Sequence, residues 1–214
     1  MKIGVMTPTY NRPDFIRSLV LQMQNQTLTP DILAIHENGH PESYRWAIDD
    51  IATSINVVWI HTPHAVCQDD WYATPLARLI NENCTHFFWC DHDDFYYRNH
   101  IESGIKKLEE GYDHVVNQHC DQILLKKDKF EVSRHSQFTA HAPGGMSSSM
   151  CFRRNFAIDL LEDLKANQGT HYWSDNVVKH VTMPKFKCIT STASTTGYVA
   201  HAQSVSSSAW VLEK

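Results

Sequence analysis

The first half of the chain alternates between short apolar runs and segments of helical character, and this order constrains the fold more than any other feature. Apolar runs that predict strands lie at residues 2–6, 32–36, 56–61 and 85–90. Helices are predicted between them, after the start signal at residues 11–14 and at residues 42–52 and 70–83. Strands separated by helices form right-handed crossovers, so the pattern predicts an α/β fold with a mostly parallel central sheet flanked by helices.

The second half of the chain has a different character. It predicts helices at residues 99–110 and 154–167, and short strands at residues 114–117, 122–125, 130–132 and 185–190. These short runs lack the regular alternation of the first half. They predict a smaller, mixed or partly antiparallel extension at the C-terminal side of the main sheet.

Composition narrows the classes of function. Lys and Arg number 19 against 24 Asp and Glu, a net charge of −5, so the basic surface that binds nucleic acid is not expected. No run of about 18 apolar residues predicts a membrane span. The 6 cysteines form no CxxC pair and lie mostly in apolar runs, which is typical of free thiols in a reducing compartment. We therefore expect a cytoplasmic protein.

An acidic segment directly follows an aromatic strand in the run Phe87–Asp94. Three carboxylates and an imidazole crowd together there, and such carboxylates repel one another unless a cation or hydrogen-bond donors compensate. Hard oxygen ligands suit Mg²⁺ or Mn²⁺. A solvated acidic loop is the alternative. A zinc site is disfavoured, because Cys84 and His92 would lie about 26 Å apart along an extended strand.

Polar residues also follow the other predicted strands, at residues 7–12, 37–39 and 61–64. In open parallel sheets, ligands bind beyond the carboxyl ends of the strands. The sequence therefore predicts one ligand site that these loops share with the acidic segment.

Three segments, in this order, resemble the nucleotide-sugar glycosyltransferases of the GT-A fold, in particular their family 2. Residues 3–12, which end in Thr-Pro-Thr-Tyr-Asn-Arg, resemble the opening strand and nucleotide loop of that family. Residues 91–93, Asp-His-Asp, resemble its DxD metal motif, and residues 173–175, Trp-Ser-Asp, resemble its later acidic motif. The resemblance covers nearly the whole chain.

The resemblance implies a Rossmann-like GT-A domain over residues 1–214, with a nucleotide-binding half at residues 1–95 and an acceptor-binding half at residues 96–214. It further implies a UDP-sugar donor, a glycan or glycoprotein acceptor, and Mn²⁺ or Mg²⁺ as cofactor. The serine-rich stretch at residues 204–208 looks like a linker, so further domains C-terminal to this one are expected.

Binding roles follow from the same resemblance. Nucleotide contacts fall on Pro8, Thr9, Tyr10, Arg12, Glu37, Asn38 and Asp91, and metal ligation falls on Asp93, Asp91 and His201. The strand end His36–Gly39 departs from the acidic pair and Gly-Ser that the family often has, and Asn38-Gly39 is also a common turn. A surface turn before the first helix is the alternative for Tyr10 and Arg12, and a structural imidazole is the alternative for His201.

The resemblance places the acid–base residue at Asp175, beside Trp173, whose ring could stack on a sugar. Asp175 as a helix cap is the alternative. Gly145 and Met146 fall where family members contact the sugar or acceptor, although a plain flexible loop fits equally well. With inversion Asp175 would deprotonate the acceptor hydroxyl. With retention it would position the acceptor or stabilise positive charge on the sugar.

Two other functions compete with this interpretation. A sugar nucleotidyltransferase shares the sheet topology, but it would carry a glycine-rich, basic loop after the first strand, and residues 7–12 contain no glycine. A non-catalytic carbohydrate-binding module would explain the tryptophans and tyrosines without requiring a DxD motif. Turnover of a nucleotide sugar distinguishes these functions.

Overall fold

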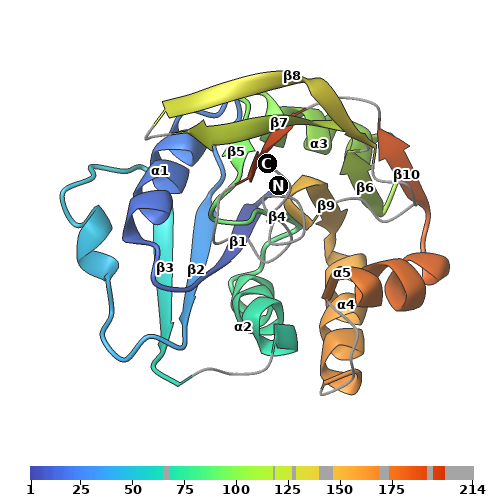
Figure 1. Cartoon of the computed structure of the whole chain (residues 1–214). Helices are drawn as coiled ribbons and strands as arrows, with labels where there is room; N and C mark the ends of the chain where they lie inside the picture. Colours follow the sequence, from blue (N-terminus) through green and yellow to red (C-terminus); the bar gives the residue numbers. More distant parts are fainter. Residues whose placement is uncertain are drawn as a thin grey trace.

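The computed structural model describes the backbone of residues 1–64, 68–117, 119–126, 129–139, 147–168, 174–191 and 195–200. At its centre lies a seven-stranded sheet of order β10-β6-β9-β4-β1-β2-β3 (Figure 1). Its strands are β1 (Ile3–Thr9), β2 (Ile32–Asn38), β3 (Asn56–Thr62), β4 (His86–Trp89), β6 (His114–Asn117), β9 (Met150–Arg153) and β10 (Cys188–Ser191). All neighbours pair in parallel except β9, which runs antiparallel to both β4 and β6. The predicted mostly parallel sheet is confirmed.

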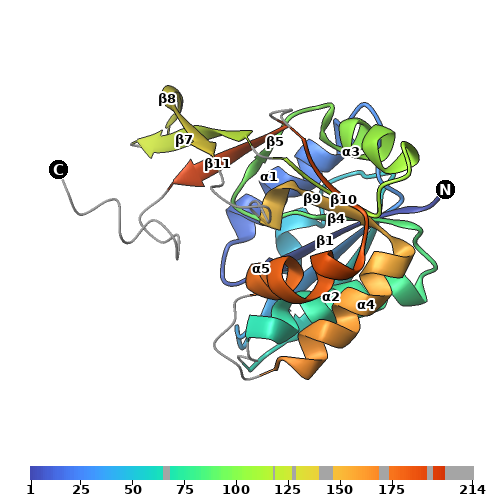
Figure 2. The ribbon, with the colours of Figure 1, turned by 90° about the vertical axis from the view of Figure 1, so that its right-hand side faces the viewer.

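Helices cover both faces of this sheet (Figure 2). One face carries α1 (Pro13–Gln24) and α3 (His100–Glu109), and the other carries α2 (Gln68–Asn81), α4 (Arg154–Ala166) and α5 (Ser174–Val177). A π-helical turn, Val178–Thr182, and a 3-10 turn, Met183–Lys185, follow α5. Among the helices that the structure describes, none combines the length and the apolar character needed to cross a membrane.

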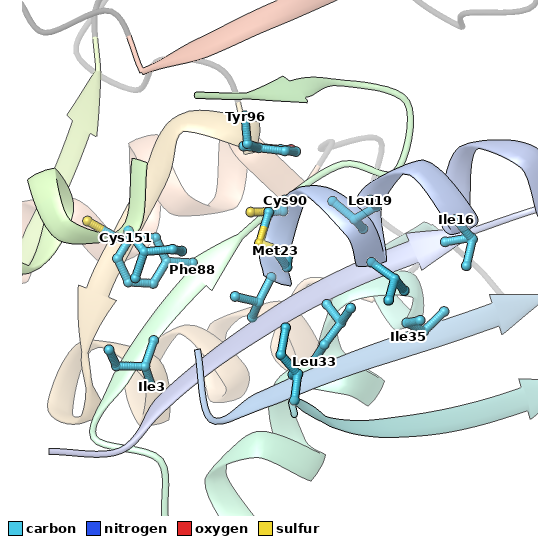
Figure 3. Packing of buried hydrophobic residues seen from close by; sticks show 14 of the residues in the cluster. Ile3, Ile16, Leu19, Met23, Leu33, Ile35, Phe88, Cys90, Tyr96 and Cys151 are labelled. Carbon is cyan, nitrogen blue, oxygen red and sulfur yellow. The ribbon is translucent and has the colours of Figure 1, made fainter. Parts of the chain in front are cut away.

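Two apolar clusters hold the layers together, because alternate strand residues point to opposite faces. Val5 faces the α1 side and Met6 the α2 side, and both are fully buried. On α1, Ile16, Leu19 and Met23 recur at helical spacing and pack against the sheet (Figure 3). Full burial of such a side chain contributes about 1.5–3 kcal/mol.

A second, smaller sheet has the order β5-β11-β7-β8. Its strands are β5 (Phe95–Tyr96), β7 (His119–Lys126), β8 (Lys129–Thr139) and β11 (Thr196–Ala200). The β7–β8 and β5–β11 pairs are antiparallel, whereas β11 and β7 are parallel. Figure 1 shows β7 and β8 crossing one end of the main sheet. This sheet is the predicted mixed extension. Two of the strands that were predicted for it, β6 and β10, belong instead to the main sheet.

The prediction of a helix over residues 42–52 was wrong. Only a 3-10 turn, Arg45–Ile48, forms there. The backbone N–H of Tyr44 and the hydroxyl of Ser43 donate to the buried carboxylate of Glu37, at 2.9 and 2.7 Å. These bonds fix the segment to the end of β2, so a side chain outside the segment determines its backbone course.

The described cysteines confirm the expected free thiols. Cys84, Cys90 and Cys151 are buried and Cys188 is half-buried, and all four are free. Burial raises the pKa of the Cys84 and Cys188 thiols to about 11. The thiols therefore stay protonated and pack as small apolar groups.

Candidate functional site

The candidate site lies beyond the carboxyl ends of β1 and β4, where the order of strands along the sheet reverses. Strand β1 pairs with β2 on one side and with β4 on the other, and the connecting helices α1 and α2 cover opposite faces. At such a switch point the loops after the two strands diverge and leave room for a ligand. The imidazole Nδ1 of His92 donates to the carbonyl of Pro8 at 3.1 Å. This bond joins the loop after β1 to the acidic loop after β4.

The loop after β1 combines one buried and one exposed side chain. Thr9 is 3% exposed, and its hydroxyl accepts a hydrogen bond from Tyr44 at 2.9 Å. Tyr10 is 57% exposed. Asn11 has a φ of 47°, a left-handed conformation that asparagine tolerates better than most residues and that turns the chain into α1. The guanidinium carbon of Arg12 lies 4.6 Å from the centroid of the Phe15 ring.

A buried carboxylate organises the neighbouring loop. Glu37 is fully buried at the end of β2, and besides Ser43 and Tyr44 it accepts a bond from the indole N–H of Trp59 at 2.8 Å. Burial raises the pKa of Tyr44 to about 12, so its hydroxyl remains a neutral donor to Thr9. Glu37 therefore supports the wall of the β1 loop through Tyr44.

The first aspartate of the acidic loop is held on two sides. Tyr72 of α2 donates to Oδ1 of Asp91 at 2.8 Å, and the Ser148 hydroxyl lies 2.9 Å from Oδ2. The Ser148 hydroxyl also contacts Oδ2 of Asp94, a residue that is 4% exposed. The Tyr96 hydroxyl donates to the main-chain carbonyl of Asp91 at 3.0 Å. Two carboxylates thus meet at one serine.

Burial controls the protonation of the groups around this aspartate. Burial raises the pKa of Tyr72, and the adjacent charge of Asp91 adds to this effect. Burial also raises the pKa of Tyr96, together with the nearby Cys90, Asp94 and Asp91. Burial lowers the pKa of His92 despite the opposing charges of Asp93 and Asp91. A neutral imidazole at position 92 agrees with its role as donor to Pro8. The tyrosine hydroxyls therefore stay protonated beside Asp91, and the lowered pKa of His92 favours its neutral form.

The structure brings together the predicted residues of the first half of the chain. Pro8 and Asp91 lie on two loops that a hydrogen bond joins, Asp93 is half-buried in the same acidic loop, and Asn38 is 3% exposed at the end of β2. Within the described part of the chain, no group of three His, Cys, Asp or Glu side chains is arranged to hold a metal.

The predicted residues of the second half are less fully described. Asp175 lies in α5, whose backbone the structure describes, but its side chain is outside the described set. Gly145, Met146, Trp173 and His201 lie outside the described residues. Their roles stay predictions.

Sequence reasoning did not predict that Tyr72 and Ser148 contact Asp91. Tyr72 lies in a predicted helix, where a tyrosine at a buried position indicates a core residue as readily as a functional one. Ser148 precedes β9, which pairs antiparallel with β4 through Phe87 with Phe152 and Phe88 with Cys151. Continuing this register by three residues sets Ser148 opposite Asp91, but the pairing itself was not predicted.

Known proteins resemble this chain in fold but not detectably in sequence family. No family model matches the chain, and no curated protein matches its sequence. S. aureus TarS 1–349 in complex with UDP-GlcNAc superposes with a TM-score of 0.69 at 13% identity, covering 98% of this chain and 62% of that one. The mannosyltransferase PcManGT from Pyrobaculum calidifontis, in complex with GDP-Man and Mn²⁺, has a TM-score of 0.66 at 14% identity, covering 94% of this chain and 58% of that one.

This chain therefore spans only 58–62% of the length of these two neighbours. The matches nevertheless extend over both sheets, since they cover nearly all of this chain. Together with the strand order and the flanking helices, they show the fold class that the sequence predicted. The chain has the GT-A fold of glycosyltransferases.

Proposed function

We propose that this chain is a metal-dependent glycosyltransferase that moves a sugar from a UDP-sugar to a glycan or glycoprotein acceptor. The main support is the meeting of the TPTYNR loop and the DxD loop at the switch point, joined by the bond between His92 and Pro8. Solved structures that match the fold hold UDP-GlcNAc, UDP, or GDP-Man with Mn²⁺. Residues 1–95 would bind the nucleotide and residues 96–214 the acceptor.

The nucleoside would lie against the loop after β1. The exposed ring of Tyr10 is free of the core and suited to stacking on uracil. Pro8, Thr9, Arg12, Asn38 and Asp91 would complete the contacts to base and ribose. A carboxylate has about four acceptor sites, and donors occupy only part of that capacity at Glu37. Glu37 would therefore accept a further bond from the nucleoside and also support the pocket through Tyr44.

The carboxylate oxygens of the acidic loop are of the ligand type that Mn²⁺ and Mg²⁺ prefer. The carboxylates of Asp91 and Asp94 meet at one hydroxyl, and a bound cation would relieve any repulsion between them. Such ions are commonly held by one or two carboxylates completed by substrate phosphates and water. We assign Asp93 as the main ligand, with Asp91 and His201 as further ligands. When bound, the ion neutralises charge on the departing diphosphate.

Transfer forms a bond between the acceptor oxygen and the anomeric carbon. The bond from that carbon to the diphosphate breaks, and the leaving UDP takes the electron pair. We assign Asp175 to take the proton of the acceptor hydroxyl if the reaction inverts the anomeric centre, and to orient the acceptor if it retains configuration. Trp173 would stack on the sugar, and Gly145 and Met146 would contact sugar or acceptor.

Calorimetry with UDP and GDP, each with Mn²⁺ and with chelator, tests the nucleotide site, and hydrolysis or transfer of UDP-sugars tests the reaction. We expect UDP to bind more tightly with Mn²⁺ and UDP-sugars to turn over. Formation of UTP from UDP-sugar and pyrophosphate would instead support a nucleotidyltransferase. Glycan binding without nucleotide binding or turnover would support a carbohydrate-binding module.

A further inference from the structure

The carboxylate of Asp91 receives hydroxyl contacts from two elements that are far apart in sequence. Tyr72 approaches Oδ1 from α2, and Ser148 approaches Oδ2 from the 3-10 turn Ser147–Ser149 before β9. An unsupported loop carboxylate samples several rotamers, and ordering it on binding costs free energy. A carboxylate that a hydroxyl group contacts at each oxygen avoids part of this cost.

We propose that Tyr72 and Ser148 are positioning residues that orient Asp91 toward the bound nucleotide. The inference rests on the proposed function, because it assigns Asp91 to the donor site. Neither residue is assigned a direct contact with the donor. Both act through Asp91, so removal of either hydroxyl weakens nucleotide binding without removing a nucleotide contact.

Tyr72 is built into a rigid part of the molecule. Its ring centroid lies 3.9 Å from that of Trp89, which is fully buried at the end of β4. This contact fixes the ring, so the hydroxyl reaches Asp91 in one direction. The hydroxyl donates its single proton to Oδ1 of Asp91 at 2.8 Å, and a bond to a carboxylate is stronger than one between neutral groups.

Ser148 is equally constrained. It is fully buried, and the antiparallel register of β9 on β4 sets it beside Asp91. A hydroxyl carries a single proton, so at any moment Ser148 donates to Asp91 or to Asp94. Rotation of one carboxylate therefore alters the hydrogen bonding of the other. Ser148 connects the two aspartates as one unit.

The experiment removes each hydroxyl and keeps the remaining shape. Tyr72→Phe and Ser148→Ala are compared with the parent by calorimetry with UDP and Mn²⁺, at a temperature where all variants are folded. Tyr112→Phe is the matched control for the ring hydroxyl. Tyr112 precedes β6, which runs in the same direction as β4, so it lies at the amino ends of these strands, away from the candidate site. Ser18→Ala, on the exposed side of α1, is the control for the serine.

We expect the Kd for UDP to rise about tenfold in Tyr72→Phe and in Ser148→Ala and to stay within about twofold in the controls. In an Asp91→Ala background, Tyr72→Phe should have no further effect, because its action passes through the missing carboxylate. A merely structural role would lower the thermal midpoint and leave the UDP affinity of the folded protein unchanged.

Parental UDP affinity in both variants would overturn the inference and leave the proposed function standing. A tenfold loss that persists in the Asp91→Ala background would overturn it as well, since the hydroxyl would then act independently of Asp91. Absence of UDP binding in the parent itself would overturn the proposed function, and the inference with it.

Discussion

At the scale of single residues, the loop after β1 contains a buried residue that packs within the fold and an exposed residue that a ligand can reach. Thr9 is buried and bonded to Tyr44, whereas Tyr10 is 57% exposed. A buried residue cannot be removed without loss of packing, but an exposed ring can. Tyr10 therefore offers a direct test of the nucleoside pocket.

Tyr10→Ala should weaken UDP binding by roughly 1–3 kcal/mol, the range measured for base–aromatic stacking. The free energy of unfolding should change by less than about 0.5 kcal/mol, because the ring lies outside the core. Calorimetry and urea unfolding measure the two quantities. Tyr10→Phe, which keeps the ring, is the control. Unchanged UDP affinity in Tyr10→Ala would favour the surface-turn interpretation.

Asp93→Ala should abolish the gain in UDP affinity that Mn²⁺ produces. The residue is half-buried in a loop beyond the end of β4, so the fold should persist. Calorimetry with Mn²⁺ and with chelator measures the gain. Asp49→Ala, an exposed aspartate after the 3-10 turn Arg45–Ile48, should bind like the parent. If Asp93→Ala keeps the full Mn²⁺ effect, the ligand assignment is wrong.

At the scale of elements, close contact between α3 and the sheet depends on a glycine. A Cβ atom at Gly104 would lie 2.6 Å from Cε1 of Phe88 and 2.7 Å from Sγ of Cys151. Phe88 and Cys151 are paired neighbours on β4 and β9, the strands that lead to Asp91 and from Ser148. The packing of α3 on these strands therefore helps to position the acidic loop.

Gly104→Ala should lower the free energy of unfolding by roughly 1–3 kcal/mol, because overpacking the core outweighs the gain of about 1 kcal/mol in helix propensity. Urea unfolding measures the change. Glu109→Ala, at an exposed position of the same helix, is the control and should have little effect. A more stable Gly104→Ala variant would show that α3 moves away from the sheet at little cost.

Helix α5 carries the predicted acid–base residue. The buried side chain of Val177 belongs to the cluster that α2 and α4 also form, so α5 packs against these two helices. Asp175→Asn should lower turnover by about 10²–10⁴-fold while the UDP affinity stays near that of the parent. Steady-state kinetics and calorimetry separate the two effects. Loss of UDP binding would place Asp175 in the donor site, and parental turnover would leave it as a helix residue.

At the scale of the whole molecule, two buried histidines link stability to pH. His114 stacks on Phe156 and lies beside Phe152, and neither of its ring nitrogens has a hydrogen-bond partner among the described residues. His100 is bonded to Thr195 through Nδ1. Burial lowers the pKa of both imidazoles to about 3. Both therefore remain neutral in the folded protein at neutral pH.

The unfolded chain protonates these histidines near pH 6.5, whereas the folded chain does not. Stability is therefore complete above about pH 6.5 and is lost as the pH falls toward 3, by about 2 kcal/mol for each histidine at pH 5. Urea unfolding at about pH 7.5 and pH 5 measures the loss. His114→Phe should reduce the loss, whereas His180→Gln, at an exposed position, should not. An equal loss in His114→Phe and the parent would contradict the assignment.

Sequence alone determined the elements whose signals are local. The helical spacing of Ile16, Leu19 and Met23 and the apolar run before Asp91 predicted α1 and β4, because side-chain periodicity follows directly from backbone geometry. The order of strands and helices then restricted the topology to a parallel sheet. The loops at the carboxyl ends, and hence residues 8–12 and 91–94, followed from that topology.

Only the tertiary structure decided what depends on contacts between distant residues. The segment at residues 42–52 follows the buried Glu37 rather than its own helical pattern, and the four-residue strand β9 is recognisable only once it lies between β4 and β6. Tyr72 and Ser148 meet at Asp91 across 19 and 57 residues of sequence. Such contacts arise from the register of strands and the packing of helices, and a local pattern of residue types does not contain them.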